Sequence, residues 1–305
     1  MGKPAAGSPL LPLEWAAIVG IVLVWGINNI AAKYLTHYIP PIFAGGLRFS
    51  VALVFLIPFI KPPFPDPKRL LLILVLIGPL NAGLIYLGFS MVHSLSAYIV
   101  SLQLWVPFTA LFAWLILGEV MLGIQLLGLV IAFGGIAWMT LSPGAQGDIP
   151  GILVGVAASI AWALGTILVR QVPSIKAFKL QGLTAALSAP LMLGVAFASE
   201  KNIGPAVAAA PLLVWACVFW AAVLSTVGAT AIMFWLVQRR EPGRIMPYFL
   251  MTPLVSAAIS VAFMGEIITW QVAMGGAATL AGVALVALAE RRLAKATTRS
   301  EKVGC

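Results

Sequence analysis

The chain has few charged residues, few cysteines and few histidines, and each shortage excludes a class of protein. Only 9% of its 305 residues are charged, whereas 62% are hydrophobic. Because a soluble domain carries about 25% charged residues, this composition predicts a protein that is solvated by lipid. Cys217 and Cys305 offer no disulfide framework and no zinc-ligand spacing, and His37 and His93 are the only histidines. We therefore expect no metal and no other cofactor.

The sequence also lacks the motifs of membrane-embedded enzymes. It has neither a GxSxG elbow nor a GxGD motif, it places no carboxylate deep in an apolar run, and His93 has no evident acidic partner. Chemistry inside a membrane needs a nucleophile–base pair, paired aspartates or a metal cluster, so we expect that the protein is not an enzyme. Without a buried carboxylate, His93 is the only obvious group for proton coupling.

Long apolar runs make up most of the chain. A helix needs about 20 mainly apolar residues to cross the hydrocarbon layer. The runs are continuous, which favours helices over the short alternating strands of a barrel. The sequence thus predicts an all-α membrane protein with ten transmembrane helices, at residues 13–34, 42–60, 69–91, 95–117, 122–141, 151–171, 179–199, 212–237, 244–264 and 268–289.

The basic residues are distributed unequally between the two sides of these spans. With a cytoplasmic N-terminus, the outer segments hold Lys33 and Lys201, Arg48 lies within a span, and the other fifteen of the 18 Lys and Arg lie in inner segments. This bias predicts a multi-pass protein with both termini in the cytoplasm. The net charge of +9 follows from the membrane topology, so we expect no nucleic-acid partner.

One phrase occurs twice in the chain. The run "VPFTALFAWLILGE" ends at Glu119, and "TPLVSAAISVAFMGE" ends at Glu266. Glycines follow nine and sixteen residues after each glutamate, at Gly128 and Gly135 and at Gly275 and Gly282. Spans 1–5 therefore correspond to spans 6–10, and an odd number of spans inverts the second copy. We predict repeats at 1–145 and 146–292 and a basic cytoplasmic tail at 293–305.

Further segments resemble a known family. The phrases "WGINNIAAK", "GGLRFS" and "WALGTILVR", together with the repeated phrase, resemble the EamA-type ten-helix branch of the drug/metabolite transporter superfamily. The resemblance implies a carrier in the bacterial inner membrane that binds a small molecule and exports amino acids or other metabolites by alternating access. It leaves open drugs or nucleotide-sugars as substrates, and a monomer or weak homodimer. The aromatic residues and "LQLWVPF" are most similar to YddG-type aromatic amino acid exporters.

Polar and aromatic side chains at helical spacing form the candidate substrate site. Polar groups deep in a span usually face the bundle interior or a wet cavity. Aromatic walls would hold an apolar side chain, and hydroxyls and amides would bind amino and carboxylate groups. The candidates are Asn28, Tyr86, His93, Tyr98, Gln103, Trp105, Trp162, Tyr248 and Thr252.

Each candidate has an alternative structural role. Tryptophans and tyrosines also form belts at membrane interfaces, and hydroxyls and amides also join helices to one another. His93 lies near the outer end of its span, where water reaches it. Arg48 either attracts a substrate carboxylate or extends towards a helix end.

Prolines and glycines indicate where helices bend or approach closely. Pro107 and Pro253 are hinge candidates, because each lacks an amide and should leave the carbonyl of Gln103 or Phe249 without its helical partner. The alternative is a passive kink. The four glycines after the repeated phrases predict close packing, in a scaffold or at a dimer face. Glu119 and Glu266 are expected to cap helix ends.

Overall fold

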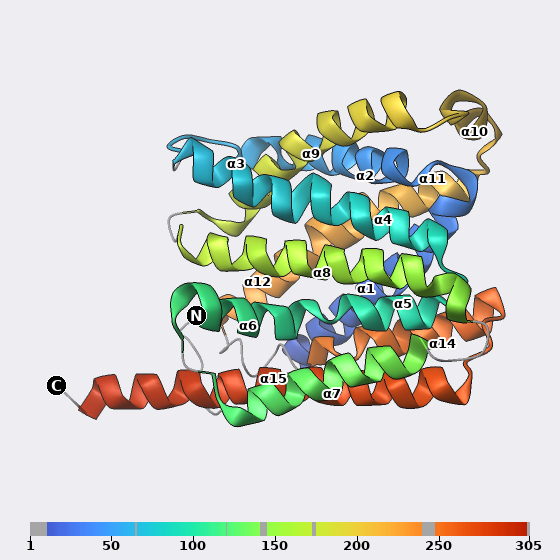
Figure 1. The fold of residues 1–305 in the computed structure, drawn as a ribbon. Helices are drawn as coiled ribbons and strands as arrows, with labels where there is room; N and C mark the ends of the chain where they lie inside the picture. Colours follow the sequence, from blue (N-terminus) through green and yellow to red (C-terminus); the bar gives the residue numbers. More distant parts are fainter. Residues whose placement is uncertain are drawn as a thin grey trace.

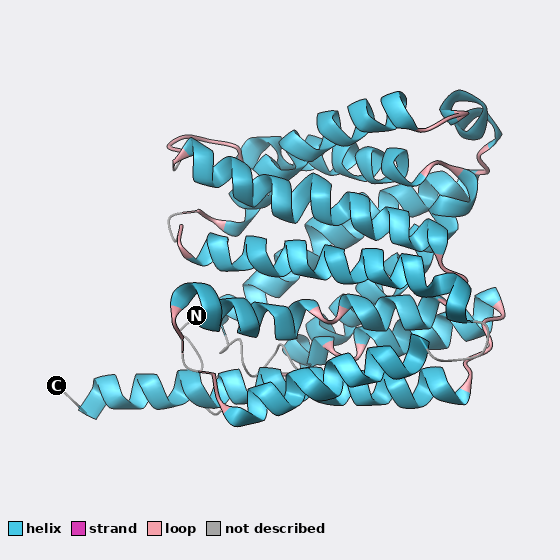
Figure 2. Ribbon diagram, in the orientation of Figure 1, coloured by secondary structure: helices cyan, strands magenta, loops and turns pink. Residues whose placement is uncertain are grey.

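The computed structural model describes residues 11–64, 66–119, 121–140, 145–172, 175–239 and 248–303. All regular structure within these residues is helical, and the helices lie side by side in one bundle (Figures 1 and 2). Lys3, Arg240, Arg244 and Cys305 lie outside the described residues. The prediction of an all-α protein is therefore confirmed for the described part of the chain.

The helices match the apolar runs closely. In order they are α1 (Pro12–Tyr38), α2 (Pro41–Leu56), η1 (Ile57–Phe59), α3 (Pro67–Val75), η2 (Leu76–Leu80), α4 (Asn81–Met91), α5 (Leu95–Leu102), α6 (Trp105–Leu117), α7 (Gly123–Thr140), η3 (Ala145–Asp148), α8 (Ile149–Arg170), α9 (Ala177–Ser199), α10 (Ile203–Ala209), α11 (Leu212–Phe219), η4 (Trp220–Ala229), α12 (Thr230–Arg239), α14 (Thr252–Met264) and α15 (Trp270–Val303). In the described residues, nine helical stretches are long and apolar enough to cross a membrane, and α14 is a shorter apolar helix.

Irregular segments interrupt two pairs of spans at related positions. Spans 3 and 8 contain the π-helical segments η2 and η4. In η2 the backbone kinks at Gly78, immediately before Pro79. Spans 4 and 9 are interrupted by two-residue turns, at 103–104 and at 250–251. Each residue of the second turn lies 147 positions after the corresponding residue of the first turn.

The two helices that follow these turns share their length and their ends. Both α6 and α14 have 13 residues, and each ends at a glycine with positive φ, 67° at Gly118 and 66° at Gly265. Pro107 and Pro253 lie in the first turns of these helices, where a missing amide costs little. The Gln103 carbonyl lacks its i+4 partner as expected, but its oxygen accepts a hydrogen bond from the Val106 amide at 3.2 Å. The turn therefore contains an i→i+3 hydrogen bond, which gives the Gln103 carbonyl a partner.

Glycines bring α7 and α15 into backbone contact. A Cβ added at Gly135 would lie 2.5 Å from the Gly275 carbonyl oxygen, and one added at Gly128 would lie 2.7 Å from that of Gly282. The two helices are therefore antiparallel, and they lie side by side in Figure 1. The predicted close packing is confirmed, and the glycine faces are buried within the chain.

The other large contacts pair helices from the two halves. Helix α2 packs on α9, α8 packs on α4 and α6, and α1 packs on η4 and α14. The largest buried apolar cluster, which includes Leu35, Phe89, Tyr98 and Val218, lies where α1 and α4 end and α2, α5 and α11 begin. We call this the α10 end of the bundle, after the helix that lies there (Figure 1).

Candidate functional site

A carboxylate from the second half caps a helix of the first half at the α10 end. Glu266 accepts hydrogen bonds from the Ser94 hydroxyl at 2.9 Å, the Ser96 amide at 3.0 Å and the Ser260 hydroxyl at 2.6 Å. Ser94 and Ser96 lie at the start of α5, where amides lack helical partners and negative charge is favoured. The capping role expected for Glu266 is confirmed, and the cap joins α5 to α14.

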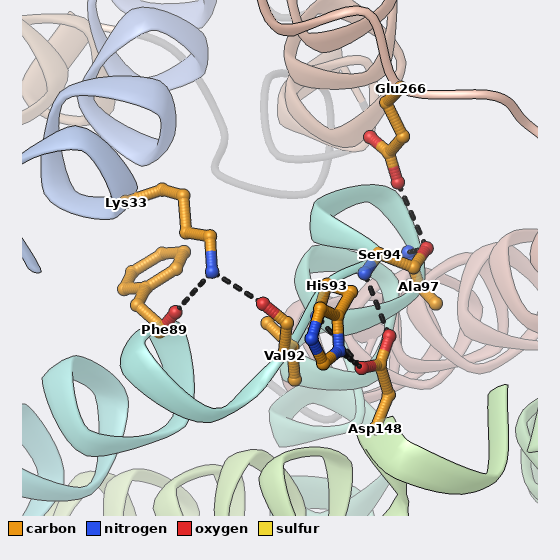
Figure 3. A network of polar contacts seen from close by, with 8 residues as sticks. All are labelled: Lys33, Phe89, Val92, His93, Ser94, Ala97, Asp148 and Glu266. Atoms are coloured by element: carbon orange, nitrogen blue, oxygen red, sulfur yellow. Dashed lines mark hydrogen bonds and ion pairs between the residues drawn. The ribbon is translucent and has the colours of Figure 1, made fainter. Parts of the chain in front are cut away.

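A second carboxylate holds the turn between α4 and α5. Asp148 accepts from the amides of His93 and Ser94, both at 2.7 Å, and its Oδ1 lies 2.9 Å from His93 Nδ1 (Figure 3). The expectation that His93 has no acidic partner is therefore wrong. The His93 side chain is 89% exposed, so the structure places it at the surface of this turn.

Lys33 is buried at the same end. Its ammonium group donates to the carbonyl of Phe89 at 2.7 Å and to that of Val92, both at the C-terminus of α4 (Figure 3). A cation at this place satisfies carbonyls that the helix leaves open and interacts favourably with its dipole. Lys33 lies within α1, which continues past it to Tyr38.

Three of the candidate site residues carry buried polar atoms without a partner. These atoms are Asn28 Oδ1, the Tyr86 hydroxyl and Thr252 Oγ1. Among the described residues, the other buried side-chain atoms without a partner are Gln181 Oε1 and Ser188 Oγ. Buried polar atoms in proteins are almost always hydrogen-bonded, so atoms of this kind indicate a place for water or a ligand. They lie on α1, α4, α14 and α9.

Other candidates lie at the break in span 4. Gln103 is in the turn, Trp105 is the first residue of α6, and Pro107 follows in its first turn. Trp105 and Gln103 are both partly buried, and the Trp105 carbonyl accepts from Thr109 at 2.7 Å. The break therefore carries an aromatic ring, an amide and a proline on neighbouring positions.

Three aromatic candidates are placed elsewhere. Tyr98 is buried, and its hydroxyl donates to the Ile85 carbonyl at 2.9 Å. The Tyr248 ring packs edge-on against Trp15, with 4.9 Å between ring centres. Trp162 on α8 is 39% exposed. Tyr98 shares a buried apolar cluster with Tyr86, while Tyr248 packs near the start of α1 and Trp162 lies at an exposed position on α8.

The sequence did not single out Thr226, which contacts Arg48, or Gln181, which contacts Thr226. The Arg48 Nε donates to Thr226 Oγ1 at 2.9 Å, and the Gln181 amide donates to the Thr226 carbonyl at 3.2 Å. Their position in the sequence could have identified them, since both are polar residues within apolar runs. Neither follows the four-residue spacing that identified the other candidates.

A protein-family comparison decides the class. The model of the EamA-like transporter family matches residues 14–141 and again residues 149–288. The chain belongs to the EamA-like transporter family. It is therefore a multi-pass membrane transporter and not an enzyme, in agreement with its apolar helices and repeated sequence.

Curated relatives of the chain span nearly the same length. The chain is 24% identical to "Uncharacterized transporter YvbV" of Bacillus subtilis over 279 residues, which cover 87% of this chain and 88% of the relative. It is 23% identical to a "Probable amino-acid metabolite efflux pump" of Salmonella typhimurium and 21% identical to a protein of the same name from Escherichia coli. Each of these two matches covers 86% of this chain and 91% of the relative.

A solved structure supports the fold of this EamA-like transporter. The match, described only as "Crystal structure of protein", has a TM-score of 0.62 at 17% identity and covers 92% of this chain and 98% of the other.

Proposed function

We propose that this transporter exports amino acids, and that aromatic or large apolar ones are its main substrates. The observation that carries the proposal is the set of unpartnered polar atoms on Asn28, Tyr86 and Thr252, within a bundle of apolar helices. An amino acid supplies both the ammonium and the carboxylate group that such atoms bind. Two relatives named as probable amino-acid metabolite efflux pumps support the substrate class and the direction.

The proposed architecture is a pair of inverted five-helix repeats, at 1–145 and 146–292, with a basic tail at 293–305. The glycine contacts support it, because a shift of 147 residues turns the contact between Gly128 and Gly282 into that between Gly275 and Gly135. The equal lengths of α6 and α14 and the related breaks before them support it too. Inverted repeats around a central site are typical of carriers that work by alternating access.

We propose that the α10 end faces away from the cytoplasm, in the bacterial inner membrane with both termini cytoplasmic. The positive-inside bias of the sequence supports this orientation. The C-terminal part of α15 lies at the end of the bundle opposite to α10 (Figure 1). With the cap of Glu266 and the apolar cluster at the α10 end, the structure then corresponds to a carrier that is closed to the outside.

In this proposal the aromatic candidates line the substrate path and the prolines act as hinges. Trp105, Trp162, Tyr98 and Tyr248 would contact the apolar part of the substrate, and Gln103 and His93 its polar groups. The turn just before α6 and the turn just before α14 support a hinge function of Pro107 and Pro253, because irregular backbone lets the two parts of a span move separately.

Counterflow in proteoliposomes tests the function. Vesicles that are loaded with unlabelled L-phenylalanine should accumulate labelled L-phenylalanine, L-tryptophan or L-leucine with saturation, with and without a pH gradient. Saturable exchange is typical of a carrier. Recovery of the labelled amino acid in chemically unchanged form excludes an enzymatic reaction. Failure of every amino acid in the panel to exchange would contradict the proposed substrate class.

The change Trp105→Ala should lower this counterflow by about tenfold or more. Burial of an aromatic ring against the substrate contributes about 1.5–3 kcal/mol to the free energy of binding. Trp114→Ala is the matched control, since Trp114 lies on the same helix and is 48% exposed. Size-exclusion chromatography in detergent should show that both variants fold. An unchanged flux in Trp105→Ala would remove Trp105 from the substrate site.

A further inference from the structure

Arg48 points into the bundle. Its Nε donates to Thr226 on η4, which belongs to the other half of the chain. On the same face of α2, Ala44 and Ala52, one turn to either side of Arg48, are both 0% exposed. Arg48 therefore lies on a face of α2 that is buried in the bundle.

Among the side chains that the structure describes, no carboxylate forms an ion pair with Arg48. A guanidinium remains charged in proteins and offers five N–H donors. One of them is bound by Thr226, whose own hydroxyl donates to the Ala221 carbonyl. A cation inside a transmembrane bundle is costly unless an anion or several polar groups compensate it. The remaining donors of Arg48 therefore favour an anionic ligand.

Tyr86 provides a second and independent observation at the same place. Its side chain is 0% exposed, and its hydroxyl has no hydrogen-bond partner. Tyr86 lies close enough to Arg48 for the two side chains to interact electrostatically, and its hydroxyl makes no hydrogen bond of normal geometry. The ring packs on α2, where a Cβ added at Gly45 would lie 3.2 Å from Tyr86 Cδ2. The phenol is thus held next to the cation while its own proton is left without an acceptor.

We propose that Arg48 and Tyr86 form the site that binds the carboxylate of the transported substrate. A carboxylate matches the planar fork of a guanidinium and accepts two parallel hydrogen bonds from it. One of its oxygens can accept the Tyr86 hydroxyl as well, which satisfies the buried phenol. Thr226 and Gln181 act as positioning residues, since they hold the guanidinium and the backbone beneath it. The inference rests on the proposed function, and it adds a requirement that the substrate carries a carboxylate.

A binding assay with three probes tests this site. L-phenylalanine carries both charged groups, 3-phenylpropionate only the carboxylate and L-phenylalaninamide only the amine. On the wild-type protein, the first two should bind and compete with each other, and the amide should bind roughly 10- to 100-fold more weakly than L-phenylalanine. This comparison needs no variant, so it does not depend on the folding of a mutant.

Variants then locate the site. Arg48→Gln should weaken the binding of both carboxylates by roughly 10- to 100-fold and leave the amide unchanged. Arg48→Lys should recover part of the loss, and Tyr86→Phe should weaken carboxylate binding by roughly 3- to 10-fold. Arg69→Gln, at an exposed position on α3, should change nothing.

The outcomes separate this inference from the proposed function. If L-phenylalanine and the amide bind equally well to the wild type, or lose affinity equally in Arg48→Gln, the carboxylate site is wrong while amino acid transport stands. If 3-phenylpropionate binding depends on Arg48 but no amino acid exchanges in vesicles, the site stands and the proposed function fails. If no carboxylate binds the wild type, both are wrong.

Discussion

The variant Gly135→Leu should fail to give a folded protein. The added Cβ alone would lie 2.4–2.7 Å from the Thr279 hydroxyl, the Gly275 carbonyl and the Thr279 amide, and two of these three are backbone atoms. Backbone cannot move away as the end of a flexible side chain can, so α7 and α15 must separate. Overpacking a tight contact costs about 1–3 kcal/mol or more, and here the contact joins the two halves of the chain.

The neighbouring glycine gives a matched control. A Cβ at Gly134 meets no atom within 4 Å. Leucine is also a better helix former than glycine, so Gly134→Leu should leave the protein folded. The measurement is fluorescence-detected size exclusion of both variants with thermal unfolding in detergent. Equal yields and equal melting temperatures for the two variants would show that the contact between α7 and α15 does not hold the halves together.

The variant Glu266→Ala should open the α10 end. The carboxylate accepts hydrogen bonds from Ser94, Ser96 and Ser260, and it thereby links α5 to α14. Hydrogen bonds to a charged group contribute about 1.5–3 kcal/mol, and 1.4 kcal/mol corresponds to a tenfold change in a population. In a carrier with two states, removing contacts made in the closed state favours the open one.

Thiol labelling measures this opening. Leu95→Cys, in a protein with Cys217 and Cys305 replaced by alanine, introduces a thiol within the apolar cluster of the α10 end. Its labelling by an impermeant maleimide should become about tenfold faster or more when Glu266→Ala is added. Asp66→Ala is the control, because Asp66 caps α3 within one half and joins no other helix. Equal labelling rates in the two variants would show that Glu266 is only a local cap.

The sequence predicted the spans well because the thickness of the hydrocarbon layer sets the length of each apolar run. The boundaries of α5 and α6 together, at Leu95 and Leu117, agree with the predicted span. The seven residues of α10 were not predicted, because a helix of this length is too short to stand out as an apolar run. Helix α1 continues to Tyr38, beyond the predicted end of its span at residue 34, because a helix can extend past the apolar run that marks it in the sequence.

Contacts between distant residues limited the prediction of the site. His93 and Asp148 are 55 positions apart, and Arg48 and Thr226 are 178 apart, so neither pair shows a local spacing. Tyr98 was selected for its helix face, and the backbone carbonyl to which its hydroxyl donates could not be foreseen, since no sequence pattern encodes such an acceptor. Asn28, Tyr86 and Thr252 were selected as polar groups within a span, and their unpartnered atoms agree with this physical reason.

A reversible cross-link at the α10 end tests alternating access between the two halves most directly. Ser96→Cys and Glu266→Cys, in the protein without Cys217 and Cys305, replace side chains whose oxygens lie 2.8 Å apart. We expect that a short bis-methanethiosulfonate linker stops counterflow of L-phenylalanine, that reduction restores it, and that each single-cysteine variant is insensitive to the linker. Full counterflow in a completely cross-linked protein would contradict the proposal, because substrate would then pass without any separation of α5 from α14.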